Sequence, residues 1–159
     1  MKLIKLALFS VVILFIIVTF IGLLFPSKVV VSRAIDISQK TDSVYPYVKD
    51  LFAWKQWVTG MQGQKIVSAT ETKIGNSTIK IISSNPKEII GKWIEKNGDT
   101  QNTTLSLIES QNKTIVHWQF EQHIKWYPWQ RFASMVNDKV IGSMMQENLD
   151  NLKKIVEAN

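Results

Sequence analysis

The sequence predicts an α+β domain, in which an antiparallel sheet packs against one long C-terminal helix, behind a single N-terminal transmembrane helix. An apolar run without charge, Leu6–Phe25, stands near the N-terminus. Four or five short β-patterned segments then follow one another closely, and the last long segment is amphipathic with a helical period. A sheet that buries one face needs a cover, and only the last helix is long enough to provide it. We expect a membrane anchor over 1–27 and one folded domain over 28–159.

The apolar run is long enough to cross a membrane. At about 1.5 Å per residue, a helix over Leu6–Phe25 just spans a hydrocarbon core of roughly 30 Å. A cleaved signal peptide is the main alternative, but the run exceeds the usual apolar region and no small-x-small cleavage site follows it. A type IV pilin is a second alternative, but its glycine-phenylalanine processing site and its buried glutamate are missing. The run therefore favours an uncleaved anchor.

The flanking charges only weakly specify the orientation of this anchor. Lys2 and Lys5, together with the α-amine, favour a cytoplasmic N-terminus. Basic residues on the other flank favour the opposite orientation, and they are Lys28, Arg33 and Lys40. The expected localisation is a single-pass membrane protein with its N-terminus in the cytoplasm.

Composition excludes several classes of function. Lys2 and Lys5 account for two of the 19 basic residues and all 13 acidic residues follow the apolar run, so the folded part carries about +4. These charges are dispersed without a basic block, which indicates a solvated surface and no nucleic-acid partner. The chain has no cysteine, which excludes a disulfide framework, a thiol nucleophile and a lipid attached to cysteine.

The segments after the anchor read as one strand and a short helical region. Lys28–Asp36 is rich in β-branched residues and is typical of a strand. Ser38 is a suitable helix N-cap, and Gln39–Trp57 has apolar residues at helical spacing. Pro46 should kink or end a helix, so we expect two short helical pieces here.

The middle of the chain predicts an antiparallel meander. Asn97-Gly98 is a strong hairpin signal between two of its strands. In the last strand, Val116, Trp118 and Phe120 share one face, and His117 faces the other way. The expected strands, the first of which has the weakest pattern, are Gln64–Thr70, Asn76–Ser84, Glu88–Lys96, Asn102–Ser110 and Lys113–Gln122.

The C-terminal part predicts a loop and a helix. His123–Phe132 is dense in aromatic residues and reads as a loop. Ala133–Val156 carries an apolar stripe at helical spacing, which predicts one long helix that covers the sheet.

At three places the sequence resembles a known superfamily. Leu24–Lys28 forms a leucine-phenylalanine-proline-serine-lysine junction after the anchor, Val44–Leu51 precedes two spaced tryptophans, Trp54 and Trp57, and Asn151–Lys154 ends the last helix. Together with the order of elements, these motifs are similar to those of the SRPBCC (START-like, polyketide cyclase/dehydrase-like) superfamily, and most similar to its bacterial membrane-anchored members.

The resemblance implies a helix-grip fold, in which a curved antiparallel sheet of six to seven strands wraps around the long C-terminal helix. It also implies an apolar cavity between them, in which relatives hold lipids, sterols or other hydrophobic molecules and a few catalyse reactions. The chain departs from the pattern between Trp57 and Asn76, where the segment is short. One strand is therefore in doubt, and with it the width of the cavity.

Alternation and helical phase, read with this fold, select ten residues as cavity-lining candidates. The alternative is that these side chains simply fill a packed core. The ten residues are Trp93, Leu105, Leu107, Val116, Trp118, Phe120, Ile141, Met144, Met145 and Leu149.

No motif for metal binding or catalysis is present. His117 and His123 are the only histidines, and their separation, without cysteine nearby, fits no metal site. Glu121 is the nearest carboxylate on the face of His117, but one such pair does not define a general base. We therefore predict no metal, no cofactor and no catalytic residue.

Aromatic residues and nearby basic residues make the loop before the last helix unusual. Trp and Tyr prefer the headgroup level of a bilayer, so a lid or membrane contact is one interpretation and packing over the helix end is the other. The residues concerned are Trp126, Tyr127, Trp129 and Phe132.

The function that these observations favour is a membrane-tethered binding module for a small hydrophobic or lipid-like ligand. Two alternatives remain open. The first is an enzyme of cyclase, dehydratase or hydrolase type acting on a hydrophobic substrate, and the second is a protein-interaction module with a filled core. Fold-level likeness does not choose among them, because this fold hosts many activities.

Overall fold

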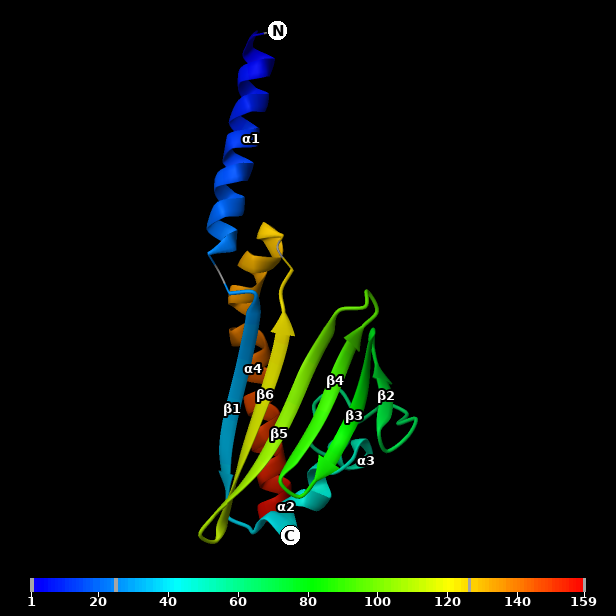
Figure 1. Ribbon diagram of the computed structural model, residues 1–159. Coiled ribbons are helices and arrows are strands. Elements are labelled where there is room, and N and C mark those ends of the chain that lie inside the picture. The colour runs from blue at the N-terminus through cyan, green and yellow to red at the C-terminus, as the bar shows by residue number, and fades with distance from the viewer. Residues whose placement is uncertain (1, 25, 126, 159) are drawn as a thin grey trace.

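The computed structural model of the chain describes residues 2–24, 26–125 and 127–158, with the side chains of 131–138 outside the description. One helix precedes a domain of six strands and three further helices (Figure 1). In chain order the elements are α1 (Lys2–Leu23), β1 (Lys28–Ile37), α2 (Thr41–Val48), α3 (Leu51–Trp54), β2 (Glu71–Ile74), β3 (Ser77–Asn85), β4 (Glu88–Glu95), β5 (Thr100–Ser110), β6 (Lys113–His123) and α4 (Pro128–Glu157).

The strands form one curved antiparallel sheet in the order β1-β6-β5-β4-β3-β2, and α4 lies along its concave face (Figure 1). A register shift between Ile81 and Ser83 of β3 marks a bulge, a feature that bends and twists a strand. This architecture confirms the predicted helix-grip fold, with six strands.

Strict alternation on β6 builds the buried face of the sheet. Val116, Trp118 and Phe120 are buried, whereas His117 between them is half-buried on the opposite face. The neighbouring strand continues this face, because Val31 of β1 pairs with Phe120. The alternation in the sequence therefore corresponds directly to the two faces of the sheet.

Three tryptophans join the two short helices to the sheet. The ring centroids of Trp54 and Trp57 are 5.6 Å apart, and both rings pack against Trp118 of β6. Asp50 caps α3, because its carboxylate accepts a hydrogen bond of 2.8 Å from the backbone N–H of Ala53. The cap starts the helix that delivers these rings to the core.

Helix α4 begins earlier than the sequence indicates. The predicted start, Ala133, lies inside the helix, which begins at Pro128. Proline suits the first helical position because its missing N–H has no intrahelical acceptor there. The dense aromatic residues on either side of Pro128 obscure the helical period, so the predicted loop His123–Phe132 shortens to the few residues before α4.

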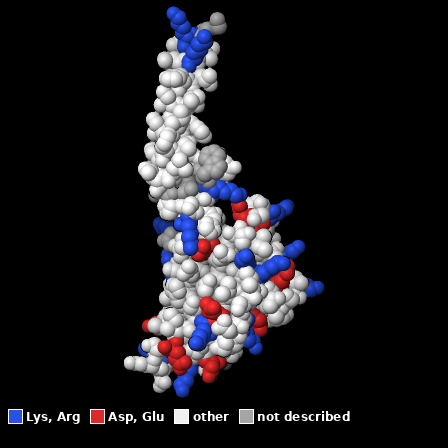
Figure 2. Space-filling model, in the orientation of Figure 1, with Lys and Arg blue, Asp and Glu red and all other residues white. Residues whose placement is uncertain are grey.

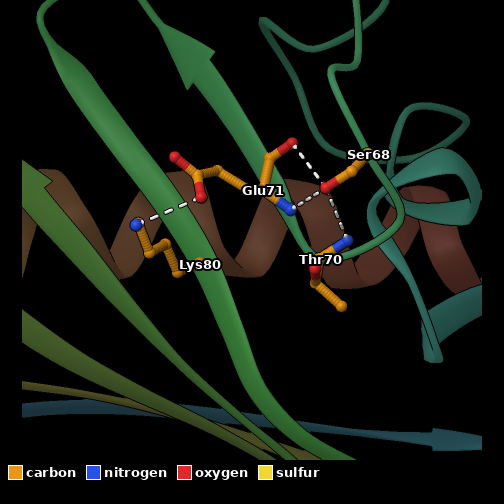
Figure 3. Close-up of polar contacts among 4 residues, drawn as sticks. All are labelled: Ser68, Thr70, Glu71 and Lys80. Carbon is orange, nitrogen blue, oxygen red and sulfur yellow. Dashed lines mark hydrogen bonds and ion pairs between the residues drawn. The ribbon is translucent and has the colours of Figure 1, made fainter.

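The predicted strand Gln64–Thr70 is wrong, and the first strand of the meander is β2 instead. Before β2 the chain turns at Ser68. The hydroxyl of Ser68 accepts hydrogen bonds from the backbone N–H groups of Glu71 and Thr70, at 2.9 and 3.3 Å (Figure 3). Pairing starts directly afterwards, where Glu71 lies opposite Lys80 with a 3.1 Å ion pair. A local side-chain turn thus decides where this strand begins.

Helix α1 projects from the end of the domain at which β1 begins and β4 and β6 end (Figure 1). It is long and apolar enough to cross a membrane, a test that an N-terminal signal sequence also meets. In Figure 2 the helix is uncharged except for basic residues at its free end, whereas acidic and basic residues are mixed on the surface of the domain.

The last turn of α1 packs on the start of α4. Gly22 is buried, and a Cβ atom placed on it would lie 3.4 Å from the Cα atom of Pro128. The core itself does not depend on α1, since the buried hydrophobic side chains of the described residues all lie between Val31 and Val156. The described core side chains thus pack together without a contribution from α1.

Candidate functional site

A cavity of about 290 Å³ lies between the concave face of the sheet and α4. Most of its wall is apolar, and the polar side chains around it come from several elements. The apolar lining residues are Val58, Ile74, Trp93, Trp118, Phe120, Ile141, Met144 and Met145. The polar lining residues are Thr59, Ser77, Glu95, Gln101 and Asn148.

Two periodicities bring these residues together. Trp93 and Glu95 are two apart on β4 and so share a face, and Gln101 of β5 lies opposite Trp93 in the register. On α4, Ile141, Met145 and Asn148 recur at helical spacing and turn the same side towards the sheet. The cavity therefore lies where the inward-facing side chains of the sheet and those of α4 do not come into contact.

The structure divides the ten predicted cavity residues into two groups. Around the cavity lie Trp93, Trp118, Phe120, Ile141, Met144 and Met145. In the packed core lie Leu105, Leu107, Val116 and Leu149. Contact between any of these residues and a ligand remains a prediction.

Position along the sheet separates the two groups. Trp93 and Gln101 lie near the end of the sheet from which α1 projects, whereas Leu107 of β5 and its partner Val116 of β6 lie nearer the opposite end. There α2 and α3 fill the space beneath the sheet with buried side chains such as Val48 and Leu51. Alternation predicts that a residue faces inward, but it does not distinguish a cavity from a filled interior.

Several lining residues escaped the sequence-based prediction. Val58 and Thr59 lie after α3, in a segment without a clear period, and Ile74 and Ser77 border the β2–β3 turn. Two signals were available in the sequence. Gln101 is inward-facing once the β4–β5 turn fixes the register, and Asn148 interrupts the apolar stripe of the last helix.

Most buried polar groups at the cavity have hydrogen-bond partners. The side-chain oxygen of Asn148 accepts a hydrogen bond of 2.8 Å from the backbone N–H of Thr59. The indole N–H of Trp118 donates to the hydroxyl of Thr103 at 2.8 Å. By contrast, Nε1 of Trp93 is buried without a hydrogen-bond partner among the described residues.

A surface ion pair joins the β4–β5 turn to the segment before α4. The ammonium of Lys125 lies 2.6 Å from the carboxylate of Asp99. The hydrogen bond from Lys125 holds the pKa of Asp99 below its ordinary value, and the same bond raises the pKa of Lys125. Asp99 and Lys125 are not among the described cavity-lining residues. Their ion pair therefore links the β4–β5 turn to the segment before α4 at the surface of the domain.

Two of the four proposed lid residues are described. Tyr127 and Trp129 stack with ring centroids 5.0 Å apart and planes 9° apart, and 61% of Trp129 is exposed. They flank Pro128, on which Gly22 of α1 packs, and neither is part of the described cavity lining. Trp126 and the side chain of Phe132 lie outside the described residues.

No group of three or more histidine, aspartate or glutamate side chains within the described residues is arranged to hold a metal ion. His123 lies 3.6 Å from Glu121 on the surface, and His117 is half-buried on the face of the sheet away from α4. In the described lining, Glu95 is the sole residue with a charged side chain.

Comparison with known proteins shows the fold. No family model and no curated protein matches the chain, but many solved structures do. A START superfamily protein from Mycobacterium smegmatis superposes with a TM-score of 0.61 at 16% identity, covering 81% of this chain and 97% of the other. Norcoclaurine synthase from Thalictrum flavum gives a TM-score of 0.62 at 12% identity, covering 81% and 93% of the two chains.

The likeness extends to larger proteins. BexL, a di-domain ARO/CYC protein of the BE-7585A biosynthetic pathway, gives a TM-score of 0.63 at 9% identity over 84% of this chain. The chain spans about half the length of BexL (51%) and of DynU16 (47%), a protein of the dynemicin biosynthetic locus. At such identities the comparisons establish the START-like fold and leave activity open.

Proposed function

We propose that the chain is a membrane-tethered binding module that holds one small hydrophobic or lipid-like molecule in the cavity between the sheet and α4. The observation that carries this proposal is the cavity itself, a mainly apolar space of about 290 Å³ that opens between the sheet and α4 beside the packed core. Small molecules usually bind in concave, mainly apolar sites that carry a few polar groups, and this space has that composition.

The cavity sets the size of the ligand. Its volume is at the lower end of the range of roughly 300–1,000 Å³ for small-molecule sites. At the ~30 Å³ that one water molecule occupies in the liquid, it holds about ten non-hydrogen atoms. A single short chain or one substituted ring fits this space, whereas an entire two-chain phospholipid exceeds it.

The lining favours binding over catalysis. Acid–base chemistry on a hydrophobic substrate needs polar groups that converge on the reacting atoms. In the described lining Glu95 has no second charged side chain beside it, and the amide oxygen of Asn148 is already bonded to Thr59. Burial of apolar ligand surface, at about 25 cal/mol per Å² before ordering costs, supplies the affinity instead.

The joint between α1 and α4 supports membrane tethering. Gly22 fixes the end of α1 on Pro128, so the exposed Trp129 and its stacking partner Tyr127 lie beside the end of the apolar helix. Aromatic rings of this kind are favourable at the headgroup level, and Lys125 is close by in the sequence. The cavity lies in the same half of the domain, which gives a ligand a short route to and from the bilayer.

Native mass spectrometry of the full-length chain, purified from cells and again after exposure to a total lipid extract, tests the binding function. We expect a discrete added mass in one or both samples, in the range of a small amphiphile. A chain without added mass in both samples would contradict the proposal and would favour a protein-interaction role for the outer surface.

Substitution of Tyr127 and Trp129 by alanine tests the membrane contact. If partial burial of each ring contributes about 1 kcal/mol, each substitution should weaken binding of residues 26–159 to phosphatidylglycerol-containing vesicles about fivefold. Phe52→Ala is the matched control, because Phe52 is an exposed aromatic residue on α3, away from α1. Equal vesicle binding by all variants would remove the membrane-contact interpretation.

A further inference from the structure

Among the tryptophans that pack in the domain, one differs from the rest in its hydrogen bonding. The indole N–H groups of Trp54 and Trp57 donate to the backbone carbonyls of Val48 and Tyr47, at 2.7 and 2.8 Å. Trp118 donates to Thr103. Trp93 as a whole is half-buried, but its Nε1 atom is buried and has no acceptor among the described residues. An unpaired buried donor is rare in folded proteins, because it loses its bond to water without a replacement.

The unpaired donor belongs to a residue of the cavity wall. Trp93 projects from the inward face of β4 and packs against Phe120 with ring centroids 5.4 Å apart. Gln101, its register partner on β5, and Glu95, two residues further along β4, also line the cavity. The polar side chains of the sheet wall thus gather near Trp93, while Met144 and Met145 cover the space from α4.

We infer that the ligand carries a neutral hydrogen-bond acceptor, such as a carbonyl oxygen, that pairs with the indole N–H of Trp93, an inference that rests on the proposed binding function. The acceptor completes the hydrogen bonding of a group that the fold leaves unpaired. A carboxylate is disfavoured in this position, because Glu95 lines the same cavity and like charges repel. The ligand class is therefore a small neutral carbonyl compound with an apolar body, in preference to a hydrocarbon or a fatty acid anion.

A pair of matched compounds tests this inference on the full-length chain in detergent micelles. The first compound is a nine-carbon methyl ketone, and the second is the alkene in which a methylene group replaces its carbonyl oxygen. Both have about ten non-hydrogen atoms, as the cavity requires at ~30 Å³ for each. They are offered as an equal mixture, and native mass spectrometry gives the ratio of bound ketone to bound alkene.

Three proteins are compared. Trp93→Phe removes the N–H group while keeping an aromatic ring, and it should lower the bound ketone-to-alkene ratio about two- to tenfold, the value of one neutral hydrogen bond. Ile141→Ala also changes an apolar wall residue of the same cavity, on α4, but removes no donor. It should weaken binding of both compounds and leave their ratio at the wild-type value.

Each contrary result has a distinct meaning. Equal ratios in the wild type and in Trp93→Phe would overturn the assignment of the donor while leaving the binding function intact. A fall in Ile141→Ala as large as that in Trp93→Phe would also overturn it, because cavity shape would then set the preference. A wild-type chain that retains neither compound would overturn the proposed function, and the inference with it.

Discussion

Replacing Trp118 with alanine should lower the free energy of unfolding of the domain by about 3–5 kcal/mol, the range for removing a large aromatic side chain from a core. The residue is 2% exposed, and its ring packs against those of Trp57, Trp54 and Phe120, with centroid distances of 5.5, 6.1 and 6.3 Å. Its removal also leaves the buried hydroxyl of Thr103 without its donor. A packing loss and an unsatisfied polar group therefore add in the same direction.

Denaturant unfolding of residues 26–159, followed by circular dichroism, measures this loss. Trp129→Ala is the matched control, because Trp129 is an exposed tryptophan of the same domain and its removal should change the free energy of unfolding by about 0.5 kcal/mol or less. If both variants unfold at the wild-type midpoint, the three-tryptophan cluster does not stabilise the domain as its geometry indicates.

The parts of the fold that the sequence predicts are those set by periodicity. The alternation of Val116, Trp118 and Phe120 fixed one face of β6, and the Asn97-Gly98 turn fixed the pairing of β4 with β5, as the register shows. Such patterns persist when identity does not, because a fold needs the inward positions to be apolar and about the right size. Solved structures at 9–16% identity accordingly share the architecture.

The errors arise where one side chain overrides a pattern. Ser68 satisfies two backbone N–H groups and delays β2 to Glu71, although the residues before it are compatible with a strand. Pro128 starts α4 early, because proline is favourable in the first turn and unfavourable later in a helix. A hydrophobic periodicity, which is read over many residues, does not show the effect of one such side chain.

The cavity is the feature that the sequence predicts least well, because it forms where the surface of α4 does not fit against the inward face of the sheet. Leu105 and Trp93 both face inward, but Leu105 meets packed side chains and Trp93 meets open space. The unpaired N–H of Trp93 was equally invisible, since tryptophans elsewhere in the sequence find carbonyl or hydroxyl acceptors through contacts remote in the chain. Such features depend on where α4 and α3 lie relative to the sheet.

Replacing Met144 with tryptophan should block the cavity and lower ligand affinity about five- to 150-fold, because forcing extra atoms into an occupied space typically costs ~1–3 kcal/mol. Met144 suits this test because it lines the cavity while 52% of it is exposed. A larger side chain can therefore enter the space from the rim without displacing the fully buried core. The stability of the domain should stay within about 0.5 kcal/mol of the wild type, as for other surface positions.

The matched control for this block is Val140→Trp, one turn earlier on the same helix. Val140 is 56% exposed and is not among the described lining residues, so an indole at that position adds the same bulk to α4 outside the cavity. Native mass spectrometry with the nine-carbon methyl ketone should give wild-type occupancy for Val140→Trp and a strong loss for Met144→Trp. Undiminished binding in Met144→Trp would contradict the assignment of the ligand to this cavity, because an indole added at its rim competes with the ligand for a volume of about 290 Å³.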